Sequence, residues 1–131
     1  MLWHKNMECG IPTVDQEHKE LFAQVDRLLK AGDQSRAVET LNFLGKYVIR
    51  HFANEEEMHI VTGYPRAKEH EKLHRDFTSA LMQLRKEYED SGHSLIALLK
   101  INRIAVSWLQ EHVLGADMDF ADYQRQGVPA F

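Results

Sequence analysis

The chain has 131 residues, of which 44% are hydrophobic and 27% are charged, and its formal net charge is −4. This length fits one domain, expected over residues 1–131, and is enough to bury a core without disulfides. Asp and Glu outnumber Lys and Arg by 20 to 16, and the basic residues are not clustered. These features argue against nucleic acid as a partner.

Cysteine usage and apolar content indicate the compartment. Cys9 is the single cysteine, so the chain cannot form an internal disulfide, and nothing in the sequence nearby marks its thiol as reactive. The N-terminus has no apolar run typical of a signal peptide, and no stretch approaches the roughly 20 apolar residues of a membrane span. We therefore expect a cytoplasmic protein. We also expect the chain to be a monomer.

Four segments carry apolar residues at the i, i+3, i+4, i+7 spacing of an amphipathic helix. The first helix is predicted from about Pro12 to Ala31 and the second from about Ser35 to Thr62. The third is predicted from about Pro65 to Asp90 and the fourth from about Ser94 to Leu114. A tail follows over residues 116–131.

The connections between these four segments are short, which implies that successive helices are antiparallel neighbours. The sequence shows no strand pattern and no internal repeat. The predicted fold class is all-α, an up-down-up-down antiparallel four-helix bundle. Phe120 and Tyr123 in the tail are expected to cover one end of it.

Polar residues of two kinds interrupt the apolar stripes of all four helices. Burying an imidazole or a carboxylate is costly unless the group is paired or coordinates a metal. The interrupting residues are His18, His51, Glu55, His70, His74, His112 and Asp117. A set this large, drawn from every helix, calls for one common explanation.

Spacing supplies that explanation for the second and third helices. His51 and Glu55 are four residues apart, as are His70 and His74. Side chains at this spacing lie on one face of a helix, about one turn apart, and can chelate one site.

The fourth helix needs a local irregularity. His112 and Asp117 are five residues apart, which an ideal helix would rotate roughly 140° off the common face. Both side chains can point inward only if the helix loosens or ends between them. Gly115 lies there and can permit this change.

Ligand chemistry narrows the choice of metal. Five imidazoles and two carboxylates without a thiolate suit iron, and suit zinc, copper or manganese less well. Seven ligands are too many for one ion. Two ions bridged by the carboxylates fit better.

These residues and their surroundings resemble the hemerythrin family, in particular its single-domain bacterial branch, over roughly Trp3 to Phe120. All seven ligand positions occur in order at the family spacing. The matching segments are Trp3 with Gly10, VDQEHKELF at 14–22, HFANEEE at 51–57, HEKLH at 70–74, WLQEH at 108–112 and Asp117.

The resemblance implies two non-haem iron ions joined by an oxo or hydroxo bridge. One iron would be bound by His70, His74 and His112. The other would be bound by His18 and His51. Glu55 and Asp117 would bridge the two. With about twelve octahedral positions on two irons, this ligand set leaves one open, on the iron of His18 and His51, where molecular oxygen is expected to bind.

An apolar wall around such a site would slow the entry of water and the release of oxidised iron. Residues beside the ligands in the sequence, or one turn away, are candidates for this oxygen pocket. They are Leu21, Phe52, Trp108, Leu109 and Val113.

The remaining histidines lie outside the ligand pattern. His4 and His93 are expected to be solvated. His59 stands four residues after Glu55, where relatives more often carry an apolar residue, frequently Met. It is expected to be a satisfied or exposed side chain, with a role beside the ligands as the alternative.

Glu56 and Glu57 are interpreted as part of a solvated helix face.

The leading functional hypothesis is reversible oxygen binding for carriage, storage or delivery to an oxygen-consuming enzyme, rather than catalysis. The alternatives are a di-iron oxidase, peroxidase or nitric oxide reductase, and an iron storage or sensing module.

Overall fold

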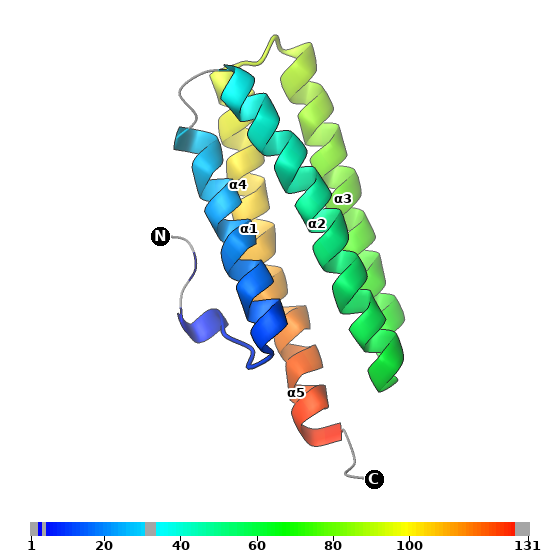
Figure 1. The fold of residues 1–131 in the computed structure, drawn as a ribbon. Helices are drawn as coiled ribbons and strands as arrows, with labels where there is room; N and C mark the ends of the chain where they lie inside the picture. Colours follow the sequence, from blue (N-terminus) through cyan, green and yellow to red (C-terminus); the bar gives the residue numbers. More distant parts are fainter. Residues whose placement is uncertain (1–2, 4, 31–33, 128–131) are drawn as a thin grey trace.

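The computed structural model describes residue 3 and residues 5–30 and 34–127. Four helices, α1 (Pro12–Lys30), α2 (Gln34–Thr62), α3 (Ala67–Asp90) and α4 (Leu95–His112), run alternately up and down (Figure 1). Each packs against its neighbours in the order α1, α2, α3, α4 and back to α1. The described residues contain no strand, and the predicted all-α antiparallel four-helix bundle is confirmed.

The helix ends follow local chemistry. At the start of α4 the Ser94 hydroxyl accepts a hydrogen bond from the Ala97 amide at 3.1 Å, a normal N-terminal cap. Helix α3 begins at Ala67, two residues later than predicted, because Pro65 belongs to the turn after α2. Gly63 opens that turn with φ 66°, a left-handed conformation that glycine adopts without strain.

The tail after α4 was wrongly predicted to lie outside the helices. A π-helical turn, η2 (Val113–Asp117), leads directly into helix α5 (Met118–Gly127), which extends the line of α4 in Figure 1. Phe120 is buried, and the Tyr123 hydroxyl donates to the Thr62 carbonyl oxygen at 3.0 Å. The expected cover over this end of the bundle is therefore present, and it is helical.

The N-terminal segment closes the same end. After the short 3₁₀ helix η1 (Lys5–Met7), the Cys9 amide donates to Asp15 at 2.8 Å, and Arg125 of α5 donates to the Cys9 carbonyl oxygen at 2.7 Å. Burial raises the pKa of the Cys9 thiol to about 12. The thiol therefore stays protonated, as expected of an unreactive cysteine.

The opposite end, where α1 and α3 end and α2 and α4 begin, has an apolar core. Its buried side chains are Leu41, Leu44, Leu81, Leu84, Tyr88, Leu98 and Ile101. They belong to α2, α3 and α4, whose apolar stripes face inward at this level.

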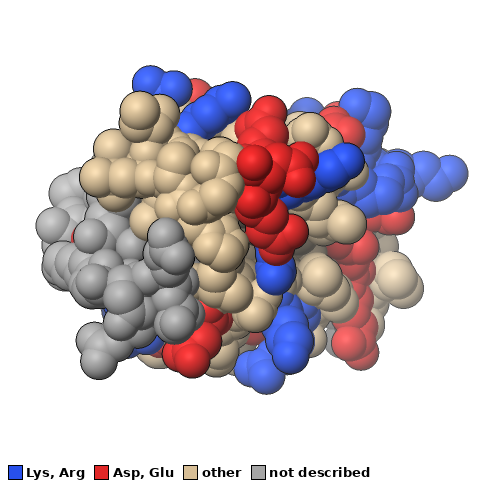
Figure 2. Space-filling model, turned by 90° about the horizontal axis from the view of Figure 1, so that it is seen from above, with Lys and Arg blue, Asp and Glu red and all other residues tan. Residues whose placement is uncertain are grey.

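The surface carries charges of both signs. Seen along the bundle from this apolar end, basic and acidic side chains alternate, with no broad basic patch on the visible surface (Figure 2). None of the described helices combines the length and the apolar character needed to cross a membrane.

Candidate metal centre

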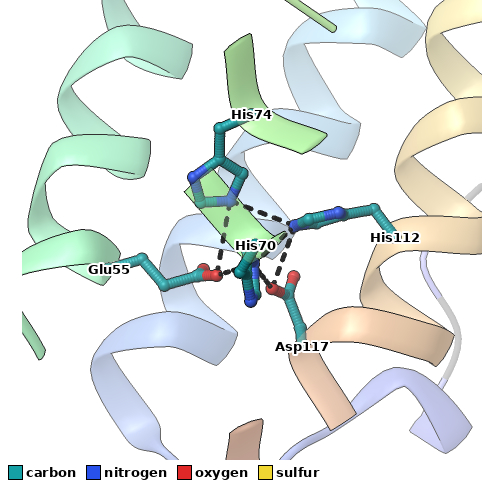
Figure 3. Close-up of side chains that lie close together, drawn as sticks. All are labelled: Glu55, His70, His74, His112 and Asp117. Carbon is teal, nitrogen blue, oxygen red and sulfur yellow. Dashed lines mark hydrogen bonds and ion pairs between the residues drawn. The ribbon is translucent and has the colours of Figure 1, made fainter. Parts of the chain in front are cut away.

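The seven polar residues selected from the sequence meet inside the end of the bundle where α1 and α3 begin. His18 comes from α1, His51 and Glu55 from α2, His70 and His74 from α3, His112 from the end of α4, and Asp117 from the end of η2. All seven are buried, with exposed fractions of 6% or less. Figure 3 shows five of them converging.

The two oxygens of Glu55 face different groups of histidines. Oε1 lies 2.6 Å from His70 Nε2 and 3.5 Å from His74 Nε2. Oε2 lies 3.4 Å from His51 Nε2 and 4.0 Å from His18 Nε2. Glu55 thus spans the space between the two groups.

Asp117 divides its oxygens in the same way. Oδ1 lies 3.0 Å from His70 Nε2 and 3.1 Å from His112 Nε2, whereas Oδ2 lies 3.0 Å from His18 Nε2. The π turn supplies the loosening that the five-residue spacing required, since it brings His112 and Asp117 to one side of the chain.

Three imidazoles form the tighter group. His112 Nε2 lies 2.9 Å from His70 Nε2 and 3.1 Å from His74 Nε2. The nitrogens therefore surround one point, with Glu55 and Asp117 oxygens beside it (Figure 3). His18, His51 and Glu55 form a second group of potential ligands.

Several polar atoms of this site lack the hydrogen bonds that buried groups normally make, which is typical of metal ligands. All four oxygens of Glu55 and Asp117, and His18 Nε2, are buried without a hydrogen-bond partner of acceptable geometry in the described part of the chain. They are nevertheless close to one another. Buried polar atoms that crowd together without pairing are the expected state of a ligand set whose lone pairs point at metal ions.

Electrostatics of the metal-free chain support the same interpretation. Burial would lower the pKa of His51, but Glu17 and Glu55 raise it to about 9. Burial likewise opposes the rise of the His70 pKa to about 9, which Asp117 and Glu55 cause. Burial and Asp117 would raise the pKa of Glu55, yet the adjacent imidazoles lower it to about 2. In the metal-free chain, the imidazoles and carboxylates of this site therefore stabilise one another's charged forms.

Comparison with known proteins agrees with this geometry. The sequence profile described as Hemerythrin HHE cation binding domain matches residues 9–123. The chain belongs to the hemerythrin family. A bacteriohemerythrin of Stenotrophomonas maltophilia is 28% identical over 137 residues, which cover 100% of this chain and 86% of that relative.

Other hemerythrin relatives match at similar distance. A bacteriohemerythrin of Pseudomonas aeruginosa is 28% identical over 134 residues, covering 98% of this chain and 84% of the relative. A myohemerythrin of Theromyzon tessulatum is 29% identical over 118 residues, covering 90% of this chain and 88% of the relative. The similarity thus covers at least 90% of this chain and at least 84% of each of these relatives.

In this hemerythrin-family chain, two carboxylates accept hydrogen bonds from the Nδ1 atoms of two candidate metal-binding histidines. His51 Nδ1 donates to Glu17 at 3.2 Å, and His74 Nδ1 donates to Glu56 at 2.8 Å. The expectation that Glu56 is only a solvated face is wrong, because its side chain is half-buried against α3. Metal-binding histidines commonly donate their second N–H to a carboxylate. Glu17 and Glu56 each stand next to a predicted ligand in the sequence, and this was the signal that could have identified them as such partners.

The five predicted pocket residues differ in how deeply they are buried. Leu21, Leu109 and Val113 are fully buried, and Phe52 is 4% exposed. The ring of Phe52 stacks on His74 with centroids 3.8 Å apart, beside a surface pocket of about 370 Å³ that both residues line.

Trp108 is the exception among these five, because it is only partly buried. Its ring stacks on His112 at 4.3 Å and on Phe77 at 4.1 Å. The Phe52 and Trp108 rings thus pack against His74 and His112, two members of the three-histidine group.

The histidines outside the ligand set differ from expectation. His59 is 1% exposed, and neither of its ring nitrogens has a hydrogen-bond partner among the residues that the structure describes. Burial lowers its pKa to about 4, so the ring is neutral. His93 is half-buried, with its ring 4.9 Å from that of Tyr88, and His4 lies outside the described residues.

Proposed function

We propose that this chain binds two iron ions and holds molecular oxygen reversibly at them. The observation that carries the proposal is the division of each carboxylate between two groups of histidines. Glu55 and Asp117 each direct one oxygen toward His70 and the other toward His18 or His51. A single ion bound beside His70 would leave the second oxygen of each carboxylate, and the histidines that it faces, without a metal ion.

The donor set supports iron. Imidazole and carboxylate ligands without thiolate suit iron in preference to copper(I) or a structural zinc site. The one thiol, Cys9, belongs to a separate apolar cluster with Val14 and Ala121. The hemerythrin relatives support the same choice, and the oxo or hydroxo bridge between the ions is part of the proposal.

The two sides of the centre are unequal. His70, His74 and His112 converge on one side, whereas only His18 and His51 belong to the other group. The side with fewer protein ligands leaves room for an external molecule. Two ferrous ions would supply the electrons with which oxygen is held there and released again.

The chain's own side chains favour binding over turnover. Leu21, Leu109 and Val113 are completely or almost completely buried apolar residues, each within three positions of a candidate ligand in the sequence. An apolar lining excludes the water and protons that would convert bound oxygen to released peroxide. We therefore propose an oxygen-binding protein for carriage, storage or delivery, rather than an oxidase or peroxidase.

Anaerobic reconstitution tests this function. The metal-free protein is loaded with ferrous iron, the iron per chain is measured, and the visible spectrum is recorded while oxygen is added and removed. We expect about two irons per chain and an absorption band that appears with oxygen and disappears without it. Rapid decay to ferric protein and peroxide would favour an enzyme, and easily exchanged iron would favour a store.

A further inference from the structure

His59 is a buried polar side chain that the proposed ligand set does not use. It lies on α2, one turn beyond Glu55, with 1% of its surface exposed. Neither Nδ1 nor Nε2 has a hydrogen-bond partner in the described part of the chain. A neutral imidazole carries one donor and one acceptor, and leaving both unpaired in a protein interior is costly.

Three rings surround His59. The Phe120 ring meets it edge-on with centroids 4.4 Å apart, and the Tyr64 ring lies at 5.2 Å. The third is His70, whose ring centroid is 4.5 Å away at an angle of 51°. Among the candidate ligands, His70 is the one whose ring packs against His59.

His70 also has an unpaired nitrogen. Its Nε2 lies 2.6 Å from Glu55 and 3.0 Å from Asp117, so this atom faces the metal centre. Nδ1, on the other edge of the ring, is buried and has no hydrogen-bond partner within residues 3, 5–30 and 34–127. A metal-binding histidine usually donates this second N–H to an acceptor.

Two other candidate ligands have such an acceptor. Nδ1 of His51 is held by Glu17, and Nδ1 of His74 is held by Glu56. Among the described residues, no carboxylate pairs with His70 Nδ1, and the His59 ring lies beside the His70 ring. The two rings with unpaired nitrogens are therefore buried and packed against each other, one on α2 and the other on α3, with centroids 4.5 Å apart.

We propose that His59 is a positioning residue for the His70 ligand, acting through a buried water that accepts from His70 Nδ1–H and donates to a ring nitrogen of His59. A bridging water suits polar atoms that share a buried space without a direct hydrogen bond. The inference rests on the proposed iron centre. It gives His70 an uncharged partner, whereas His51 and His74 have charged ones.

Three variants of the full chain, loaded with ferrous iron without air, test this role. His59→Leu removes both nitrogens, His59→Gln keeps a polar group, and Phe120→Leu disturbs the same packing without touching a polar atom. The rate of iron loss to a ferrous chelator is the main measurement. We expect His59→Leu to lose iron about 10-fold faster, the loss typical of an outer partner of a ligand, with His59→Gln and Phe120→Leu near the wild type.

Two further measurements separate positioning from packing. Metal-free His59→Leu should melt no lower than the wild type, since an unpaired buried ring is replaced by an apolar one. In zinc-loaded protein labelled with ¹⁵N-histidine, the Nδ1–H proton of His70 should exchange slowly in the wild type and quickly in His59→Leu.

Distinct results separate this inference from the proposed function. Wild-type iron release and His70 proton exchange in His59→Leu would overturn it, as would an equal effect of Phe120→Leu. A ¹⁵N signal showing His59 itself bound to zinc would also overturn it. If the wild type takes up no iron, the proposed function fails instead, and the proton exchange of the zinc-loaded protein still decides the role of His59.

Discussion

The two ends of this bundle are built from the same four helices but are stabilised differently. At the end where α2 and α4 begin, buried side chains such as Leu44, Leu84 and Ile101 are apolar and need no partner. At the other end, buried Glu55 and Asp117 have no hydrogen-bond partner among the described residues. Apolar packing alone can stabilise the first end, whereas we expect the second end to gain stability from bound metal ions.

This contrast predicts that the chain folds without metal and gains further stability when metal binds. Burial of apolar surface stabilises the fold whether or not metal is present. Metal ions that bind only the folded chain add stability that depends on their concentration. Substitutions at the two ends should therefore differ in whether their effects depend on iron.

The largest effect is expected from Glu55→Ala. It removes the carboxylate shared by both histidine groups, so iron content should fall from about two per chain to almost none. Iron at about 1,000 times its dissociation constant would stabilise the wild type by roughly 4 kcal/mol, and the variant should melt at the same temperature with and without iron. Metal analysis and thermal unfolding measure both effects.

Glu57→Ala is the matched control, because Glu57 is an exposed carboxylate two residues further along α2. It should keep the iron content and the iron-dependent stability of the wild type. Normal iron retention in Glu55→Ala would refute the ligand assignment.

The next effect is expected at the apolar end from Ile101→Ala. Ile101 is completely buried, and truncating such a side chain costs about 2–5 kcal/mol of unfolding free energy. Denaturant unfolding should show the same loss in metal-free and iron-loaded protein, with unchanged iron per folded chain. A loss seen only in the iron-loaded protein would show that the two ends are not independent.

A smaller effect is expected from pH in the metal-free protein. The pKa values of His51 and His70 are raised from 6.5 to about 9. Their contribution to stability is therefore fully present below pH 6.5 and is lost as the pH rises through 9. The unfolding free energy of the metal-free protein should therefore fall between pH 6.5 and pH 9, because the unfolded chain releases these protons at lower pH than the folded one.

Iron should reverse this trend, because metal replaces the protons on the imidazoles and binds more tightly as the pH rises. Unfolding free energies of both forms at pH 6.5 and pH 9 test the reversal. Parallel pH profiles would contradict the view that cations and protons compete for these side chains.

The smallest effect is expected from Gly115→Ala in the π turn. A Cβ atom at Gly115 would meet nothing within 4 Å, and its φ is not in the left-handed region. Alanine favours helix over glycine by about 1 kcal/mol, so stability should change by no more than that, with iron content unchanged. Loss of iron would show that the turn depends on glycine after all.

Much of the site could be predicted because helical spacing is a local property. The pairs His51 with Glu55 and His70 with His74 share a helix face whatever surrounds them. The five-residue spacing of His112 and Asp117 likewise indicated an irregular turn, which the structure shows as η2. That these residues bind iron stays a prediction.

The sequence by itself determined the helices, their antiparallel order and the polar residues on their inner faces, since periodicity and short connections decide these. Only the tertiary structure decided that Glu17 meets His51, that Glu56 meets His74, and that His59 is buried against His70. The α5 helix over the end of the bundle also appeared only there. Contacts between helices depend on how far each helix is shifted and rotated against its neighbour, and packing across the whole core sets this register.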